Sequence, residues 1–342
     1  MALLTRTPEG LFCPAGAFYI DPWRPVDRAV VTHGHADHAR WGCDHYLAAQ
    51  SGLGILRRRL GAEASLQGVA YGERIEHNGV GITLYPAGHL LGSAQVCVEQ
   101  GGERWVVSGD YKWEPDSTCE PFEPVPCHTF ITESTFGLPI YRWPRQAEVF
   151  AQINQWWRRN QEQGRTSMLF AYALGKAQRL LAGLESSIGP ILVHGAVAPL
   201  VQCYREAGIA LPEVLPASPE NAKAHKGRAM VVAPPSAMGT PWMRKFQPYS
   251  TAFASGWMQI RGTRRRRALD RGFVISDHVD WIGLQQAVHV TGAARIGVTH
   301  GYTSAMVRWL REQGYEAWAI ETRFEGELES DSDSAPAQEE TT

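Results

Sequence analysis

The sequence predicts an α/β protein whose main part is interrupted by a smaller inserted part. Two observations lead to this fold class. First, short apolar runs that are typical of strands end repeatedly at a histidine or an acidic residue, which gathers such side chains at the edge of a sheet. Second, the pattern changes after residues 138–145, which hold Pro139, Trp143 and Pro144, to an alternation of helical and strand-like segments, as in a small α/β unit.

The length and composition fit a globular protein with a sizeable core. The chain has 342 residues, of which 44% are hydrophobic, 10% aromatic and 20% charged, and its formal net charge is −2. A nearly neutral chain has no overall attraction to a polyanion, so a nucleic-acid surface would have to be a local basic patch. Two arginine clusters, at residues 57–59 and 264–267, are the candidates.

The chain gives no sign of export or of a membrane span. We find no basic start followed by an apolar core and a cleavage site, and no apolar run approaches 18 residues. The six cysteines have no CxxC spacing, which argues against a disulfide framework and against a cysteine-ligated zinc. We therefore expect a cytoplasmic protein with reduced cysteines and no membrane partner.

Residues 33–38 concentrate metal-binding side chains directly after an apolar run that is predicted as a strand. Three histidines and one aspartate occupy these six positions. In an extended segment His33 and His35 point to the same side, where two imidazole nitrogens can bind one ion at about 2.0–2.1 Å, whereas Asp37 and His38 turn toward a second position. A lone histidine is usually a packed or surface residue, but four such side chains would crowd one another without cations. The stretch therefore predicts a metal site.

Asp21 ends an apolar run just upstream of the histidines, in residues 10–31, which we predict as a β-meander. Two interpretations are open. Asp21 is either a residue that starts a turn before Pro22 or a carboxylate that orients a metal-binding histidine. Beyond the histidines, a helix is predicted over residues 39–59.

The next predicted strands also end at residues that bind metals or protons. An aspartate after glycine at a strand end is often only a turn or cap residue, but a carboxylate between two ions would bridge them and offset their charge. Four predicted strands in succession end at a histidine or an acidic residue. This is more than we expect if these residues served only in turns. A strand is predicted near residues 68–71, and three more lead to candidate residues: 80–86 to His89, 104–107 to Asp110, and 129–131 to Glu133.

Beyond residue 145, helical and strand-like patterns alternate. Residues 147–157 place apolar side chains at helical spacing, so Trp156 and Trp157 are predicted to lie in the core. His194 follows a predicted strand, and we interpret it as a strand-end histidine outside the metal set, with a substrate contact as the alternative. A helix is predicted over residues 175–184, and strands are predicted over residues 168–172, 191–193 and 230–233.

The segment that returns from the inserted part to the main part carries a candidate phosphate site. A turn of small residues precedes a run of arginines, and both backbone N–H groups and guanidinium groups suit phosphate. The alternative is a solvated charge run on a surface loop. The position of the segment, at the border of a cleft between the two parts, favours phosphate. The candidate residues are Ser255, Gly256, Arg261, Arg264 and Arg265.

The last elements bring two further histidines to the predicted site. The apolar run 272–275 ends at Ser276-Asp277-His278, and a later strand ends at His300. The alternative for His278 is a residue at a helix N-terminus without catalytic function. The remaining predictions are a helix that ends at residue 287, strands over 294–298 and 317–320, a helix over 306–313, and a disordered acidic tail over 326–342.

The order of these motifs resembles a known signature. Residues 33–38, followed by His89 and Asp110, are similar to the metallo-β-lactamase superfamily, and the later stretches around Glu133, His278 and His300 are similar to its β-CASP branch, the nucleases of DNA repair and RNA 3′-end processing. The resemblance covers nearly the whole chain and implies an αββα sandwich that is interrupted by an inserted β-CASP cap domain. The divisions it implies are residues 1–137 and 263–325 for the metallo-β-lactamase domain, 138–262 for the cap and 326–342 for the tail.

The resemblance also implies a role for each matching residue. Two divalent ions, zinc in the first place and manganese as the alternative, would activate water for phosphodiester hydrolysis. His278 would be the general acid that protonates the leaving oxygen, Glu133 would support it, and Asp21 and Asp277 would be further supporting carboxylates. The first ion would be bound by His33, His35 and His89, the second by Asp37, His38 and His300, and Asp110 would bridge both.

Two features of the sequence favour different substrates. Within the family, RNA-processing members keep a histidine at the position of His300, whereas members that act on DNA repair ends often lack it. Residues 21–24, 172–178 and 255–267 instead look like the compact bacterial exonucleases that are associated with an ATP-dependent DNA ligase. We follow this narrower match and expect a DNA exonuclease that processes DNA ends in repair, in association with such a ligase and a helicase. An RNA-processing ribonuclease and a small-molecule metallo-hydrolase are the alternatives.

Overall fold

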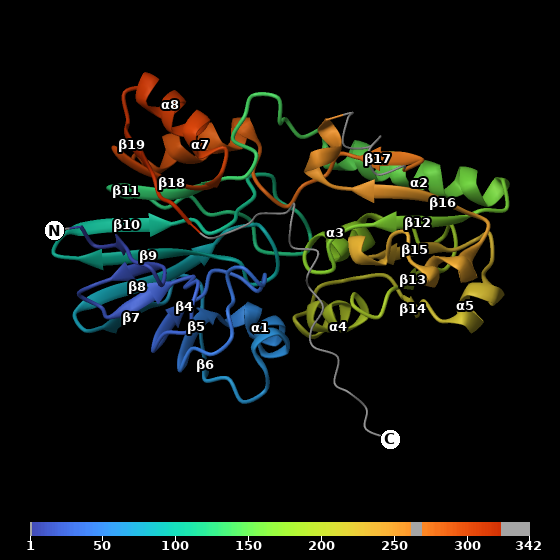
Figure 1. Ribbon diagram of the computed structural model, residues 1–342, viewed down its shortest axis with the longest axis horizontal. Helices are drawn as coiled ribbons and strands as arrows, with labels where there is room; N and C mark the ends of the chain where they lie inside the picture. Colours follow the sequence, from blue (N-terminus) through green and yellow to red (C-terminus); the bar gives the residue numbers. More distant parts are fainter. Residues whose placement is uncertain (1, 261–268, 323–342) are drawn as a thin grey trace.

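The computed structural model describes residues 2–260 and 269–322, and their strands form three sheets (Figure 1). Helices flank the sheets, so the predicted α/β class is confirmed. The predicted acidic tail over residues 326–342 lies outside the described residues, as do Arg261, Arg264 and Arg265. Among the described helices, none has both the length and the apolar character that crossing a membrane requires.

The first sheet carries the strand that leads into the histidine-rich stretch. Its six strands lie in chain order, and β3 to β6 run parallel to one another. Only β2 and β3 form part of the predicted meander, because residues 21–27 cross over to make β4 parallel to β3. The strands are β1 (Thr5–Arg6), β2 (Leu11–Cys13), β3 (Phe18–Ile20), β4 (Arg28–Val30), β5 (His45–Ala49) and β6 (Leu66–Val69).

The helix predicted over residues 39–59 is wrong over most of its length. Residues 45–49 form β5, which pairs with β4 on one side and β6 on the other, and only α1 (Leu53–Leu60) is an α-helix, preceded by the 3-10 turn η1 (Gln50–Gly52). The run Tyr46–Ala49 is buried on both faces of its sheet, and such a run cannot be told from a buried helix by periodicity alone.

The second sheet delivers most of the other candidate site residues. Its order is β19-β18-β11-β10-β9-β8-β7; the half from β19 to β10 is parallel and the half from β10 to β7 is antiparallel. Its strands are β7 (Arg74–His77), β8 (Val80–Pro86), β9 (Ala94–Gln100), β10 (Glu103–Val107), β11 (Thr129–Ser134), β18 (Arg295–Gly301) and β19 (Glu316–Ala319).

The first and second sheets pack face to face through a shared apolar core. Side chains of both sheets, among them Val30, Leu47, Ile82 and Val96, are almost fully buried together. The outer face of the second sheet is covered by α7 (Trp281–Thr291) and α8 (Thr303–Glu312), and α1 covers the first sheet through Leu56. Because both sheets have a buried inner face, the ends of their strands are where polar side chains can gather without crossing the core.

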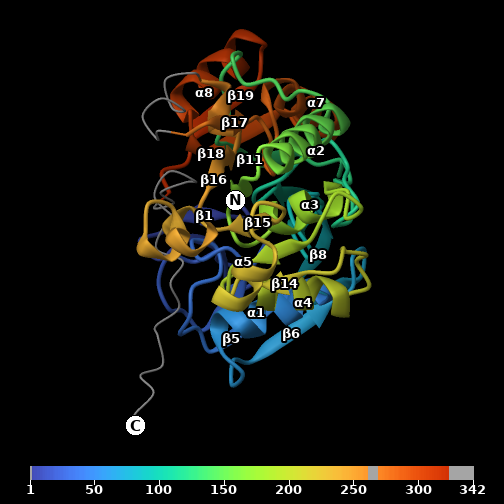
Figure 2. The same ribbon diagram turned by 90° about the vertical axis from the view of Figure 1, so that its right-hand side faces the viewer.

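The third sheet is formed by the inserted part together with one strand from beyond residue 262, Arg271–Phe273, and all its strand pairs are parallel. Helices cover both of its faces (Figure 2). Trp156 and Trp157 are buried as predicted. The strands are β14 (Leu215–Pro216), β13 (Ile191–Val193), β15 (Met230–Ala233), β12 (Thr166–Phe170), β16 (Tyr249–Ala254) and β17 (Arg271–Phe273); the α-helices are α2 (Gln146–Glu162), α3 (Lys176–Gly183), α4 (Ala198–Glu206) and α5 (Pro219–Ala224), and the 3-10 turns are η2 (Pro235–Ala237), η3 (Pro241–Phe246) and η4 (Gly256–Gln259).

The third sheet lies beside the other two, and an apolar cluster joins them where α1 faces α4 and the loop before α3 (Figure 1). Ile55 of α1 and Leu91 meet Leu174 and Tyr204 of the inserted part. The N–H of Leu91 also donates to the Tyr204 hydroxyl at 3.2 Å. Since the loop of residues 87–93 takes part in this cluster, the inserted part packs directly beside His89.

Candidate metal centre

The predicted metal-binding residues come together where strands of the first two sheets end. β4 leads into residues 33–38, β8 leads to His89 and β10 leads to Asp110, whereas His300 lies within strand β18, one residue before its end. Neighbouring parallel strands end at the same edge of a sheet, so residues that are far apart in the sequence meet there. His33, His38, His89 and Asp110 are each at most 4% exposed.

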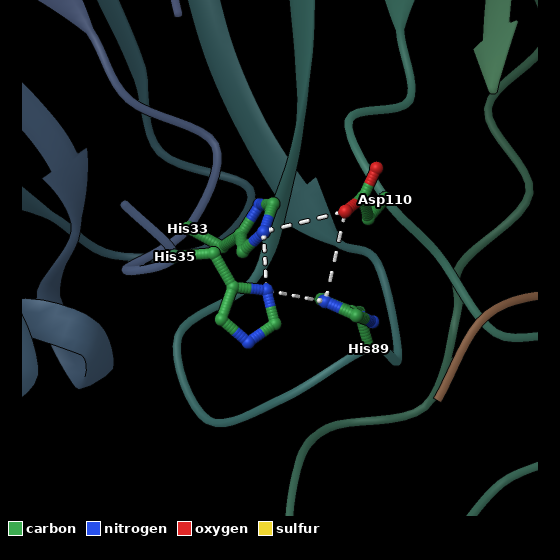
Figure 3. Close-up of side chains that lie close together, drawn as sticks. All are labelled: His33, His35, His89 and Asp110. Carbon is green, nitrogen blue, oxygen red and sulfur yellow. Dashed lines mark hydrogen bonds and ion pairs between the residues drawn. The ribbon is translucent and has the colours of Figure 1, made fainter. Parts of the chain in front are cut away.

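Three imidazole nitrogens converge on one another (Figure 3). Nε2 of His33 lies 3.0 Å from Nδ1 of His35, which lies 3.1 Å from Nε2 of His89. Oδ2 of Asp110 is 3.5 Å from the His33 nitrogen and 3.9 Å from the His89 nitrogen. All four ligand atoms lie within 4.8 Å of one another, and this donor set suits one divalent cation such as zinc.

Burial keeps two of these rings in the form that binds metals. It lowers the pKa of His33 and of His89 well below the ordinary value, and neighbouring histidines lower the pKa of each further. A neutral imidazole presents a lone pair to a cation, whereas a protonated one repels it. The residues present therefore fit a metal ion at this position.

Asp110 also lies beside a second group of candidate ligands. Its Oδ1 lies 3.0 Å from Nε2 of His300, and its Oδ2 lies 3.4 Å from Nε2 of His38, which is itself 3.8 Å from Oδ2 of Asp37. Burial alone would lower the pKa of His38, but the carboxylates of Asp110, Asp37 and Asp21 raise it well above its ordinary value. The surroundings thus favour positive charge here, as a second cation site requires.

Asp21 lies behind His38 and holds its ring. Its Oδ2 is 2.7 Å from Nδ1 of His38, and its two oxygens accept from the backbone N–H and the hydroxyl of Thr32 at 2.8 and 2.6 Å. Asp21 adopts φ +44°, a left-handed conformation that is rare outside glycine, and these three contacts hold it there. Of the two interpretations left open by the sequence, the carboxylate that orients a histidine fits this geometry.

Glu133 and His278 form a buried pair beside Asp110. Nδ1 of His278 lies 2.9 and 3.1 Å from the two carboxylate oxygens of Glu133, and 4.0 Å from Oδ2 of Asp110. The backbone N–H of Tyr111 donates to Glu133 at 2.8 Å, and the indole N–H of Trp143 donates to the carbonyl of His278 at 2.9 Å. Both side chains are therefore fixed by contacts that leave little freedom to turn.

The described part of the candidate phosphate segment is buried. The Ser255 hydroxyl accepts from the N–H of Trp257 at 3.3 Å, and Ser255 itself is fully buried. A Cβ on Gly256 would lie 2.6 Å from the Phe136 ring, so this turn packs closely against aromatic side chains. A contact with phosphate stays a prediction for these two residues, and the three candidate arginines lie outside the described residues.

Several contacts at the centre were not predicted. The carbonyl of Asp277 lies 2.9 Å from Nδ1 of His89, the carbonyl of Leu174 lies 3.4 Å from Nε2 of His35, and the Thr32 hydroxyl lies 3.1 Å from Nδ1 of His33. Thr32 could have been suspected from its place before the first ligand, but main-chain carbonyls leave no signal in a sequence. His194 packs its ring against Trp242 and lies in neither cluster of candidate ligands found among the described residues.

Comparison with known proteins gives relatives that match different shares of this chain. A protein of Opitutus terrae named "Probable DNA ligase" is 31% identical over 314 residues, which cover 91% of this chain but 30% of the relative. The "Cleavage and polyadenylation specificity factor subunit 3" of Dictyostelium discoideum is 32% identical over 35% of this chain and 16% of its own length. The "Endoribonuclease ysh1" of Schizosaccharomyces pombe is 34% identical over 46% of this chain and 22% of its own.

The chain thus spans about a third of the first of these relatives and less of the others. No family model matches it. A solved structure, described as a protein of unknown function from Enterococcus faecalis, covers 86% of this chain and 78% of its own with a TM-score of 0.59 and 12% identity, and so shares the fold. Its motifs and its relatives together show that the chain belongs to the β-CASP family of the metallo-β-lactamase superfamily.

Proposed function

We propose that the protein is a metal-dependent nuclease that hydrolyses phosphodiester bonds at DNA ends. The observation that carries this proposal is the position of Asp110, which lies between the two groups of candidate ligands. Its Oδ2 is within 4 Å of His33, His38 and His89, and its Oδ1 lies 3.0 Å from His300. We also propose that the first two sheets form an αββα sandwich and that the third sheet, with its helices, forms a β-CASP cap.

Each group of ligand-type side chains would hold one ion in this proposal, with Asp110 between them. Two bound divalent ions would lower the pKa of a shared water and stabilise the charge that develops on a phosphodiester. The first group is His33, His35 and His89, and the second is Asp37, His38 and His300. Nitrogen and oxygen donors without sulfur suit zinc, and manganese next to it.

His278 supplies the proton that the leaving oxygen needs. Because Nδ1 of His278 is engaged by Glu133 at 2.9 Å, the proton would pass to the substrate from Nε2. The buried carboxylate stabilises the protonated ring and fixes its orientation, so that Glu133 acts through His278. A small-molecule hydrolase on the same scaffold has no need of this pair, which is the reason to prefer a phosphodiester substrate.

DNA is the proposed substrate because the relative named "Probable DNA ligase" matches 91% of this chain, whereas the two relatives with RNA-processing names match 35% and 46% of it. A nuclease that trims ends before sealing would work beside an ATP-dependent ligase, and a helicase would supply the open strand. RNA is the second candidate, and it is favoured by the two relatives with RNA-processing names and by the presence of His300.

The proposal is tested by digestion of end-labelled single strands of DNA and RNA with the same sequence, in the presence of zinc, manganese or magnesium. We expect metal-dependent shortening of DNA from one end. The His35→Ala and Asp37→Ala variants should lose at least about 100-fold of the rate, because each removes a ligand that cleavage requires.

The matched control is His77→Ala, which removes a histidine in β7 that has no contact with the candidate centre. It should cleave at the wild-type rate. Cleavage of RNA alone would transfer the proposal to the second candidate, and wild-type rates in both ligand variants would rule out the assigned centre.

A further inference from the structure

A cluster of buried charges lies where the inserted part meets the candidate metal centre. It contains three cations, Lys112, Lys176 and Arg179, and two carboxylates, Asp116 and Asp277. Lys176 is fully buried and Arg179 is 6% exposed. Burying charges costs free energy even when they are paired, so a buried ion cluster is weak evidence for stability, and its geometry deserves a functional explanation.

The two cations of the inserted part, Lys176 and Arg179, both bind the short segment of residues 276–277. Nη1 of Arg179 lies 3.0 Å from Oδ1 of Asp277 and also donates to the carbonyl of Ser276, and Nζ of Lys176 lies 3.8 Å from Oδ2 of Asp277. The segment is therefore held at a main-chain carbonyl and at both oxygens of the next side chain. This leaves the peptide between Asp277 and His278 little freedom to rotate.

That peptide contacts the candidate centre on both sides. The carbonyl of Asp277 lies 2.9 Å from Nδ1 of His89, so Nδ1 donates its proton there and Nε2 turns toward His35. The residue that follows is His278, which pairs with Glu133. The carbonyl of this peptide thus orients the candidate ligand His89, and its nitrogen belongs to His278, the proposed general acid.

The N-terminal end of α3 has features that favour this contact and do not stabilise the helix itself. Lys176 is the first residue of α3, where the helix dipole disfavours a positive charge. Gly175 precedes it at φ +81°, and a Cβ there would lie 3.3 Å from Cβ of Leu90 and 3.5 Å from Oδ2 of Asp277. Only glycine brings the start of α3 this close to the loop of His89.

We propose that Lys176 and Arg179 are positioning residues of the metal centre, which hold the Asp277 peptide so that its carbonyl orients His89. The inference rests on the proposed function, because it assigns His89 to a bound ion. It also makes docking of the inserted part and binding of metal mutually dependent, since each favours the same arrangement of residues 276–278.

The test measures Mn²⁺ and Zn²⁺ binding by calorimetry on the full chain after metal removal, without any substrate. Lys176→Met and Arg179→Met should bind the first ion about 10- to 100-fold more weakly, the range found when partners of ligands are lost. Lys176→Arg keeps the charge and should restore most of the affinity. Metal should also slow amide exchange of residues 176–183 in the wild type.

The matched control is Asn154→Ala. Asn154 holds the other end of α3 through the carbonyl of Gly183 and the N–H of Glu185, and it does not contact residues 276–278. It should lower stability and leave metal affinity unchanged. If single variants do not fold, the triple variant Lys176→Met, Arg179→Met, Asp277→Asn leaves only the Lys112–Asp116 pair of the cluster, and it should still bind metal more weakly.

Wild-type affinity in Arg179→Met, or in the triple variant, would overturn this inference and leave the proposed function intact. A wild-type chain that binds neither metal would overturn the proposed function itself. The two failures are thereby distinguished in one experiment.

Discussion

Asp21 selects which nitrogen of His38 faces Asp110. A carboxylate can only accept a hydrogen bond, so the Asp21 contact at 2.7 Å requires the proton on Nδ1 and leaves Nε2 for the side of Asp110. Thr32 fixes the carboxylate in turn. The candidate ligand is thus oriented by residues that would touch neither ion nor substrate.

This gives a prediction for a single substitution. In Asp21→Asn the amide can donate as well as accept, so the ring of His38 is no longer held in one tautomer, and the second ion should bind about 10- to 100-fold more weakly. Calorimetric titration should then resolve one tight ion in place of two. Asp44→Asn, an exposed aspartate on the adjoining loop, serves as the control, and two tight ions in Asp21→Asn would contradict the assigned role.

At the same scale, the sequence predicted the candidate ligands better than the groups that hold them. Residues 33–38 are recognisable because four ligand-type side chains in one short stretch are rare, and the strand ends at His89 and Asp110 are marked by glycines. The carbonyls of Asp277 and Leu174 are common to every residue type, so only the fold reveals them.

Among the elements, the loop between β8 and β9 sets the position of His89 through a close contact of two backbones. Gly92 has φ +77°, and a Cβ there would lie 2.1 Å from Cα of Gly52 in η1. The strand end therefore fits against η1 only if both positions lack a side chain. The loop also joins the apolar cluster that faces the inserted part.

A substitution in this loop separates backbone strain from crowding. Gly92→Ala should lower the free energy of unfolding by at least about 2–3 kcal/mol, because the left-handed conformation is strained and the backbone of η1 must move. Gly101→Ala, at φ +58° with open space around it, suffers only the strain and should lose about 1 kcal/mol. Urea unfolding measures both, and equal losses would show that the contact with Gly52 is unimportant.

Some helices and strands were predicted from the sequence and others were not, because the packing partners of an element also decide its structure. Residues 45–49 were expected in a helix but form β5, because β4 and β6 pair with its two edges and its two faces are buried against the second sheet and α1. Strands β7, β9 and β16 were not anticipated. β16 is stabilised by β12, which is distant in the sequence, whereas β7 and β9 form tight hairpins with β8 and β10 through the turns at residues 78–79 and 101–102. β17 belongs to the third sheet, although residues 263–325 were expected to lie in the main part. The boundary between the cap and the second part of the metallo-β-lactamase domain therefore stays a prediction.

For the molecule as a whole, the proposed centre joins segments that are separated in the chain. His33 lies near the N-terminal end, Asp110 and Glu133 before the inserted part, and His278 and His300 after it. An ion bound by such a set favours the folded chain over the unfolded one, in which those side chains are far apart.

Metal should accordingly raise the stability of the whole chain. At a free zinc concentration 100 times the dissociation constant, one site should add about 2.7 kcal/mol to the free energy of unfolding. Thermal unfolding with and without zinc, each followed by circular dichroism, measures the shift. His35→Ala should show almost none, and an equal shift in that variant would point to zinc bound elsewhere.

The inserted part also sets the order in which the centre can be completed while the chain is being made. A nascent chain that has emerged only through residue 260 already carries His33, His89, Asp110 and Glu133, but neither His278 nor His300. In the proposed mechanism such a chain has every side chain assigned to the first ion. It lacks the proton donor, a ligand of the second ion and the Asp277 carbonyl that orients His89. A translation product cut short within the inserted part would therefore bind the first ion more weakly than the longer chain and, in the proposed mechanism, would not cleave nucleic acid.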